Sequence, residues 1–192
     1  MQQERGKRER ILEAAQSVFA RKGYYLSKIE EIAELAGVGK GTVYEYFASK
    51  EELYKEMFKV ILNRYTEYVM VEVTPEMTVK EWVRRLLEMH LRYMLENRQH
   101  MPTDFGDLGG MDTEILGWMY DMRKKSVERL VPVFQKGIER GELKDIDLEL
   151  GANLLIGMMR GVTLPLMVEG DCGKPSQVAE AMTEILFHGT AR

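Results

Sequence analysis

The sequence predicts an all-α protein of about nine helices, with a small three-helix head followed by a larger helical body. Apolar residues recur at the three- and four-residue spacing of amphipathic helices along most of the chain. No segment shows the alternation of a strand bounded by turn residues, and only five prolines interrupt 192 residues. These observations together predict helices joined by loops, without a sheet.

The first helix is predicted at about 6–22. Its apolar residues recur at helical spacing and form one stripe, which includes Val18 and Phe19. Gly23 follows the last periodic residue and stands where a C-cap glycine is expected. The apolar stripe should pack against the helices that follow.

The second and third helices are short. Ser27 is predicted as the N-cap of the second helix, and Glu30, three residues later, completes a capping-box pattern. Gly37 should end that helix, because glycine takes the positive φ of a sharp turn at no steric cost. The third helix is predicted at about 40–47.

The remaining helices are separated by breaks that contain proline or glycine. Ser49 and Glu52 form a second capping-box pattern at the start of the fourth helix. These six helices are predicted at about 50–71, 78–97, 103–108, 112–140, 148–169 and 176–188.

Charge changes sign along the chain, although the whole chain is acidic. Residues 1–50 carry nine Lys and Arg against seven Asp and Glu, net +2, whereas residues 51–192 carry 18 against 24, net −6. Such a contrast suggests that the two parts of the chain have different functions. We expect a head at 1–50 and a body at 51–192. No signal-peptide pattern and no long apolar run is present, so a cytoplasmic location is expected.

Residues 36–39 join the second and third helices in a pattern typical of a helix-turn-helix. Ala33 is small where the two helices would cross, and Val38 can fill the space between them. Ile32 and Val43 can face the first helix, so that the three helices bury one small core. This arrangement leaves the start of the third helix free, and a helix of that size fits the major groove of DNA.

Several segments of the head form a recognisable signature. They are Gly23-Tyr24, Ser27, Ile29, Ile32-Ala33, Ala36-Gly37-Val38-Gly39-Lys40-Gly41-Thr42-Val43-Tyr44-Glu45-Tyr46-Phe47 and Ser49-Lys50-Glu51-Glu52-Leu53. Together they resemble the DNA-binding signature of TetR/AcrR-type regulators over about 8–58. One departure is Lys28, which stands where many members have a second threonine; it removes a hydroxyl contact and can supply a charged one.

The resemblance implies a role for each matching position. The positions that meet base edges are Lys40, Gly41, Thr42 and Glu45, and those that contact phosphates are Thr42, Tyr44, Tyr46 and Lys50. Lys40 can donate to guanine O6 and N7, and Glu45 can accept from a cytosine amine. Gly41 lets the backbone approach the groove. The structural alternatives are partial core packing for Tyr44 and a solvated surface position for Tyr46 or Lys28.

In the resembled family the remaining helices form a dimerising sensor domain. The helix at 148–169 of this chain is apolar nearly all round, which favours burial. Small residues along it allow another helix to approach closely. The residues concerned are Gly151, Ala152, Gly157 and Gly161, joined by Ile185, Leu186 and Phe187 of the final helix. We therefore expect a homodimer through the last two helices, reading a palindrome, with a monomeric core as the alternative.

The body also suggests a small, hydrophobic effector. The chain has 14 methionines, and methionine is adaptable and suits apolar pockets. The residues expected to line the effector site are Trp82, Leu86, Met89, His90, Tyr93, Trp118, Met119, Met122 and Met158. His90 and Arg92 can contact a polar end of the ligand, although ordinary core packing is the alternative for any of these residues.

Other classes of protein have less support. Three histidines and the single Cys172 give no metal-ligand cluster, and we expect neither an enzyme nor a cofactor. The favoured interpretation is a ligand-responsive transcriptional repressor that binds a palindromic operator as a dimer and leaves it when effector binds. An activator with the same head, or a partner-binding helical protein without DNA binding, are the alternatives.

Overall fold

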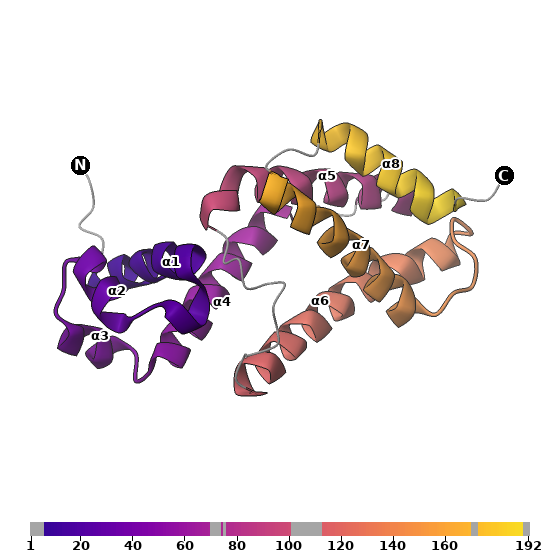
Figure 1. Ribbon diagram of the computed structural model, residues 1–192. Coiled ribbons are helices and arrows are strands. Elements are labelled where there is room, and N and C mark those ends of the chain that lie inside the picture. The colour runs from indigo at the N-terminus through magenta and orange to yellow at the C-terminus, as the bar shows by residue number, and fades with distance from the viewer. Residues whose placement is uncertain (1–5, 70–73, 75, 101–112, 170–172, 190–192) are drawn as a thin grey trace. The chain divides into compact units, whose positions relative to one another are not determined.

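The structure, a computed structural model, describes residues 6–69, 74, 76–100, 113–169 and 173–189. Within these residues the chain forms eight α-helices and one 3-10 turn, with no strand (Figure 1). The elements are α1 (Lys7–Leu26), α2 (Ile29–Ala36), α3 (Lys40–Tyr46), α4 (Lys50–Val69), α5 (Val79–Asn97), η1 (Arg98–His100), α6 (Thr113–Glu139), α7 (Leu148–Glu169) and α8 (Pro175–His188). The all-α prediction is confirmed, and the helix expected at 103–108 lies outside the described residues, as does Cys172.

Two glycines shape the head: Gly37 ends its helix as predicted, whereas Gly23, expected as a C-cap, lies inside α1, whose C-cap is Ser27. Gly23 takes φ 70° and ψ 175°, which interrupts α1 with a kink three residues before its end. Gly37 takes the left-handed conformation, with φ 65° and ψ 40°, and ends α2. Both positions require positive φ, which a side chain with a Cβ resists.

The prediction for Ser27 is wrong. The N-cap of α2 is Lys28, which makes no side-chain capping bond. Ser27 is buried, and its hydroxyl donates to the Gly23 carbonyl at 2.6 Å. A buried hydroxyl needs a partner, and the carbonyl beside the kink supplies one, so the hydroxyl is not available to cap α2. The capping box that the sequence predicts between Ser27 and Glu30 is therefore not formed.

The capping pattern at the start of α4 is confirmed for one of its two bonds. The Ser49 hydroxyl accepts a hydrogen bond from the Glu52 N–H at 3.0 Å. The Glu52 carboxylate accepts from the N–H of Ala48, one residue before the predicted donor. The start of α4 is thus fixed by local bonds, as expected for a helix that begins at Lys50.

The chain divides into two compact units, which we describe separately. Unit 1 comprises residues 1–65 and 99–116, and unit 2 comprises residues 66–98 and 117–192. The divisions fall within α4, η1 and α6 rather than in loops. The functional boundary expected at residue 50 stays a prediction.

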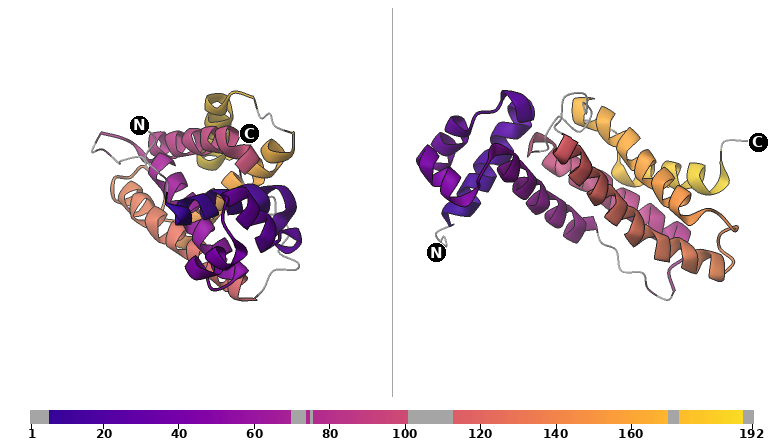
Figure 2. Two further views of the ribbon diagram at one scale, coloured as in Figure 1. Left: turned by 90° about the vertical axis from the view of Figure 1, so that its left-hand side faces the viewer. Right: turned by 90° about the horizontal axis from the view of Figure 1, so that it is seen from below.

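Unit 1 buries a core contributed by α1 to α4. α1 packs on α2, and α2 packs on α3 (Figures 1 and 2). Ile32 and Val43 are buried with Phe19, as the helix-turn-helix pattern predicts. Aromatic rings extend this core, because Phe19 and Tyr54 meet edge to face with centroids 5.1 Å apart.

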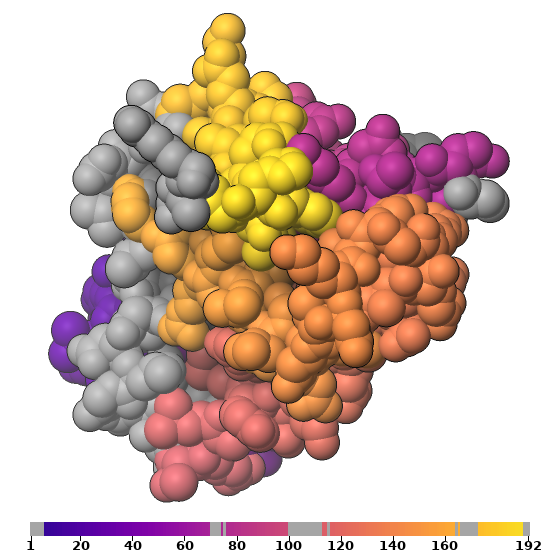
Figure 3. Space-filling model, turned by 90° about the vertical axis from the view of Figure 1, so that its right-hand side faces the viewer, coloured from indigo at the N-terminus to yellow at the C-terminus, as the bar shows by residue number. Residues whose placement is uncertain are grey.

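Unit 2 is built around α5, which packs against α7 and α8. In Figure 3, atoms of α8 (yellow) and of α7 (orange) are both exposed on the face that is drawn. The start of α5 is tied to the turn after α6, because the Val79 N–H donates to the Glu142 carboxylate at 2.6 Å. Gly137 of α6 lies so close to this corner that a Cβ there would be 2.6 Å from Val79 Cγ2. Among the described residues, no helix has both the length and the apolar character needed to cross a membrane.

Candidate nucleic-acid interface

The turn between α2 and α3 presents α3 on the surface of unit 1. The Gly37 N–H donates to the Glu34 carbonyl at 3.1 Å, and the Val38 N–H donates to the Ala33 carbonyl at 3.0 Å. Val43 and Phe47 are buried and hold α3 against the core. The opposite side of α3 is therefore left for solvent or a ligand.

All eight residues expected to meet DNA lie in unit 1, and none of them is buried. The exposed residues are Lys28, Lys40, Gly41, Tyr44, Glu45 and Tyr46. Thr42 and Lys50 are half-buried. Core packing is therefore not the main role of Tyr44, which remains 45% exposed. The individual DNA contacts stay predictions.

Gly41 leaves open space on α3. It is the second residue of the helix, and a Cβ built there would find no heavy atom within 4 Å. The fold therefore does not require glycine at this position, since its backbone is neither crowded nor in a positive-φ conformation. This is consistent with a glycine that serves close approach by another molecule.

Lys40 lies between a carboxylate and an aromatic ring. Its Nζ donates to Glu30 Oε1 at 2.6 Å and lies 5.9 Å from the centroid of the Tyr44 ring. The hydrogen bond from Lys40 lowers the pKa of the Glu30 carboxyl and raises the pKa of the Lys40 ammonium. Glu30 was not among the expected site residues, because the sequence pattern assigned it to a capping box.

Lys50 contacts the last residues of α1. Its Nζ donates to the Tyr25 carbonyl at 3.3 Å and lies 4.5 Å from the centroid of the Tyr24 ring. Partial burial lowers the pKa of Lys50. The Lys50 ammonium thus has partners on α1 and is only partly available to a phosphate.

The helix-turn-helix matches the family model described as bacterial regulatory proteins, tetR family, over residues 11–57. Residues 76–190 match a second model, described as tetracyclin repressor-like, C-terminal domain. This second match covers more than half of the chain. The chain belongs to the TetR family. Its resemblance to that family is confirmed, and it is a transcriptional regulator with a helix-turn-helix DNA-binding head.

Named TetR-type relatives extend over most of the chain. The fatty acid metabolism regulator protein of Bacillus subtilis is 27% identical, over 82% of this chain and 81% of that protein. The crystal structure of the regulator FadR from Bacillus subtilis in complex with stearoyl-CoA has a TM-score of 0.84 at 23% identity, covering 95% of this chain and 99% of that one. AibR in complex with isovaleryl coenzyme A and operator DNA has a TM-score of 0.74 at 20% identity, covering 95% and 98%.

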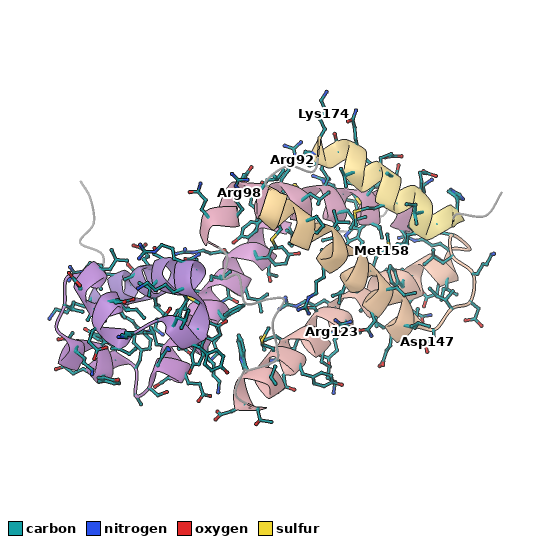
Figure 4. All side chains as sticks on the ribbon, viewed as in Figure 1. Arg92, Arg98, Arg123, Asp147, Met158 and Lys174 are labelled. Carbon is teal, nitrogen blue, oxygen red and sulfur yellow. The ribbon has the colours of Figure 1, made fainter. Side chains whose placement is uncertain are left out.

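The residues expected to line an effector site all lie in unit 2. The buried ones are Trp82, Leu86, His90 and Tyr93 of α5. The half-buried ones are Met89 of α5, Trp118, Met119 and Met122 of α6, and Met158 of α7, which Figure 4 labels. They are apolar or aromatic apart from His90, which suits a hydrophobic ligand. Their role in binding stays a prediction.

His90 and Arg92 have partners within the chain. His90 Nε2 lies 2.7 Å from Thr163 Oγ1, and the Thr163 hydroxyl donates to the Met159 carbonyl at 2.8 Å. Burial lowers the pKa of His90 to about 4, so the ring is neutral near pH 7. Arg92 is exposed and donates to Glu88 at 2.8 Å. His90 therefore carries no charge that could attract a ligand, and the charge of Arg92 is already paired with Glu88.

The small residues of α7 divide into two groups. A Cβ at Gly151 would lie 3.3 Å from the Phe134 ring of α6, and Ala152 is fully buried. These two residues therefore pack inside unit 2. Gly157 and Gly161 are exposed and have no heavy atom near a built Cβ. They accompany the exposed large side chains of Leu150 and Leu154 on α7 and of Ile185 on α8.

Proposed function

We propose that the chain represses transcription as a homodimer that binds a palindromic operator and releases it when a fatty acyl-CoA thioester binds unit 2. The observation that carries the first half of this proposal is the exposed side of α3, with Val43 and Phe47 anchoring its other side. A protein of this kind acts by binding alone, in the cytoplasm, where the DNA lies.

The proposed division of labour on α3 follows from the chemistry of its side chains. Lys40 and Glu45 read base edges, since an ammonium donates to guanine acceptors and a carboxylate accepts from a cytosine amine. Tyr44, Tyr46 and the Thr42 hydroxyl donate to phosphates and fix the position of the helix. Lys28 and Lys50 add charge at the start of α2 and α4.

The proposed dimer interface is the outer side of α7 and α8. Leu150, Leu154 and Ile185 are exposed there, beside Gly157 and Gly161. Exposed apolar side chains flanking small residues favour close packing by an identical helix pair. Two recognition helices related by a two-fold axis would then read the two halves of a palindrome.

Substituting Leu154 by glutamate is expected to raise the dissociation constant of the dimer by about tenfold or more. The two leucines of the interface lose their burial there, and two negative charges take their place. The oligomeric state can be measured by sedimentation equilibrium. Leu35 is the matched control, since both leucines are 54% exposed but Leu35 lies on α2. If L154E and L35E are equally dimeric, the proposed interface is wrong.

The effector class rests on two supports. The relative that is 27% identical is named a fatty acid metabolism regulator, and a FadR of the same fold was solved with stearoyl-CoA. In addition, the side chains expected at the site are mostly apolar, as an acyl chain requires. α4 runs from unit 1 into unit 2, so we propose that it carries the change that alters the spacing of the two heads.

The proposal is tested by operator binding with and without acyl-CoA. A duplex enriched from a randomised library supplies the operator, and fluorescence anisotropy measures its affinity. Stearoyl-CoA is expected to weaken binding at least fivefold, within the usual range of allosteric coupling, whereas free coenzyme A should have no effect. Unchanged affinity with stearoyl-CoA would reject the effector class, and failure to enrich any sequence would reject DNA recognition itself.

A further inference from the structure

Glu30 and Lys40 form an ion pair across the helix-turn-helix. Glu30 lies in the first turn of α2, and Lys40 is the first residue of α3. Glu30 Oε1 and Lys40 Nζ are 2.6 Å apart, and both side chains are more than half exposed. The pair therefore lies on the surface of unit 1 rather than in its core.

The Lys40 ammonium is held from two sides. Glu30 contacts it from α2, and the Tyr44 ring lies beneath it one helical turn further along α3. A lysine on a flexible stem normally samples many positions. The hydrogen bond to Glu30 and the Tyr44 ring, whose centroid lies 5.9 Å away, restrict the positions that the Lys40 ammonium takes.

The ion pair leaves hydrogen-bonding capacity for DNA. An ammonium has three N–H donors, and Glu30 Oε1 engages one of them. Guanine presents two acceptors, O6 and N7, in the major groove. Lys40 can therefore donate to both guanine acceptors without releasing Glu30.

The pair also changes what attracts Lys40 to DNA. A free lysine is drawn to any phosphate, and that attraction carries no sequence information. Beside Glu30 the two formal charges cancel, so the attraction of the pair for phosphates is weak while its directed donors remain. For Lys40, contacts with base edges therefore count for more, relative to contacts with DNA phosphates, than they would for a free lysine.

We propose that Glu30 is a positioning residue that determines specificity: it aims the Lys40 ammonium at base edges and cancels its attraction for phosphates. This inference rests on the proposed function, in which Lys40 meets base edges of an operator. It assigns a role in DNA recognition to a carboxylate that would otherwise only repel DNA.

The test compares Glu30→Gln with wild type on two duplexes, the operator enriched from a randomised library and an unrelated sequence of equal length. Removing the carboxylate charge should raise affinity for the unrelated duplex and steepen the dependence of log K on log salt by about 0.9. Preference for guanine at the position read by Lys40 should fall about fivefold or more, since the loss of one base contact commonly costs that much.

Glu31→Gln is the matched control. It removes the same charge one residue along α2, and Glu31 pairs with Lys22 at 2.7 Å rather than with Lys40. It should leave the base preference unchanged. If Glu30→Gln and Glu31→Gln give the same base preference and salt slope, the role of Glu30 is overturned.

A second comparison uses Lys40→Met, alone and with Glu30→Gln. In the Lys40→Met background, Glu30→Gln should cause no further loss of guanine preference. A further loss would show that Glu30 does not act through Lys40. If the wild-type protein enriches no sequence from the randomised library, the proposed function is overturned together with this inference. A wild-type chain that enriches a palindrome which Glu30→Gln reads with unchanged preference overturns this inference alone.

Discussion

Gly41→Leu is expected to remove sequence-specific DNA binding while leaving the protein at least as stable as wild type. A Cβ at Gly41 meets no heavy atom within 4 Å, so the leucine has room on the free protein. On DNA, the same side chain would stand between α3 and the groove and hold Lys40 and Glu45 away from the bases. Losing two base contacts weakens binding by about 100-fold or more.

The two parts of this prediction are measured separately. Operator affinity is measured by anisotropy and stability by urea unfolding, where leucine should gain up to about 1 kcal/mol over glycine in a helix. Gly117→Leu is the control, because Gly117 is also helical and exposed, with open space around a built Cβ. If G41L binds the operator as tightly as G117L, α3 does not approach DNA through Gly41.

Gly137→Val is expected to lower the free energy of unfolding by about 2–3 kcal/mol, as overpacking of a tight contact does. A Cβ at Gly137 would lie 2.6 Å from Val79 Cγ2 and 2.9 Å from Leu143 Cδ1. Val79 is buried, and its β-branched side chain has little rotamer freedom. The Gly137 carbonyl also accepts from the N–H groups of Glu142 and Leu143, so the backbone there has little room to shift.

Urea unfolding at one fixed protein concentration measures this effect, since dimerisation makes apparent stability depend on concentration. Gly117→Val is the matched control on the same helix, in open space. It should change stability by less than about 1 kcal/mol. Equal denaturation midpoints for G137V and G117V would show that the corner formed by α5 and α6 is not tightly packed.

Local signals account for the part of the fold that the sequence predicts. The kink at Gly23 and the helix end at Gly37 depend on a residue type that alone takes positive φ easily. The helices of both units follow from apolar periodicity, which depends only on near neighbours in the chain. The resemblance in residues 8–58 added the roles of single residues on α3.

Tertiary contacts account for what the sequence did not predict. Ser27 carries a typical N-cap side chain, but its burial beside Gly23 directs the hydroxyl to a carbonyl. Glu30 meets Lys40 only because the turn brings two helices together. Gly151 and Gly157 look alike in the sequence, yet one is packed and the other exposed. For the effector site, the same apolar residue types serve core and ligand, so composition alone does not separate the two.

The contacts of Lys50 have a mechanical consequence. Its ammonium fastens the start of α4 to Tyr24 and Tyr25, while buried Phe47 fastens the end of α3 to the same core. A displacement of the start of α4 would therefore act on α1 through Lys50 and on α3 through Phe47. In the proposed mechanism, this head is expected to move as one body with α4, so that effector binding would change the separation of the two heads rather than the shape of either one.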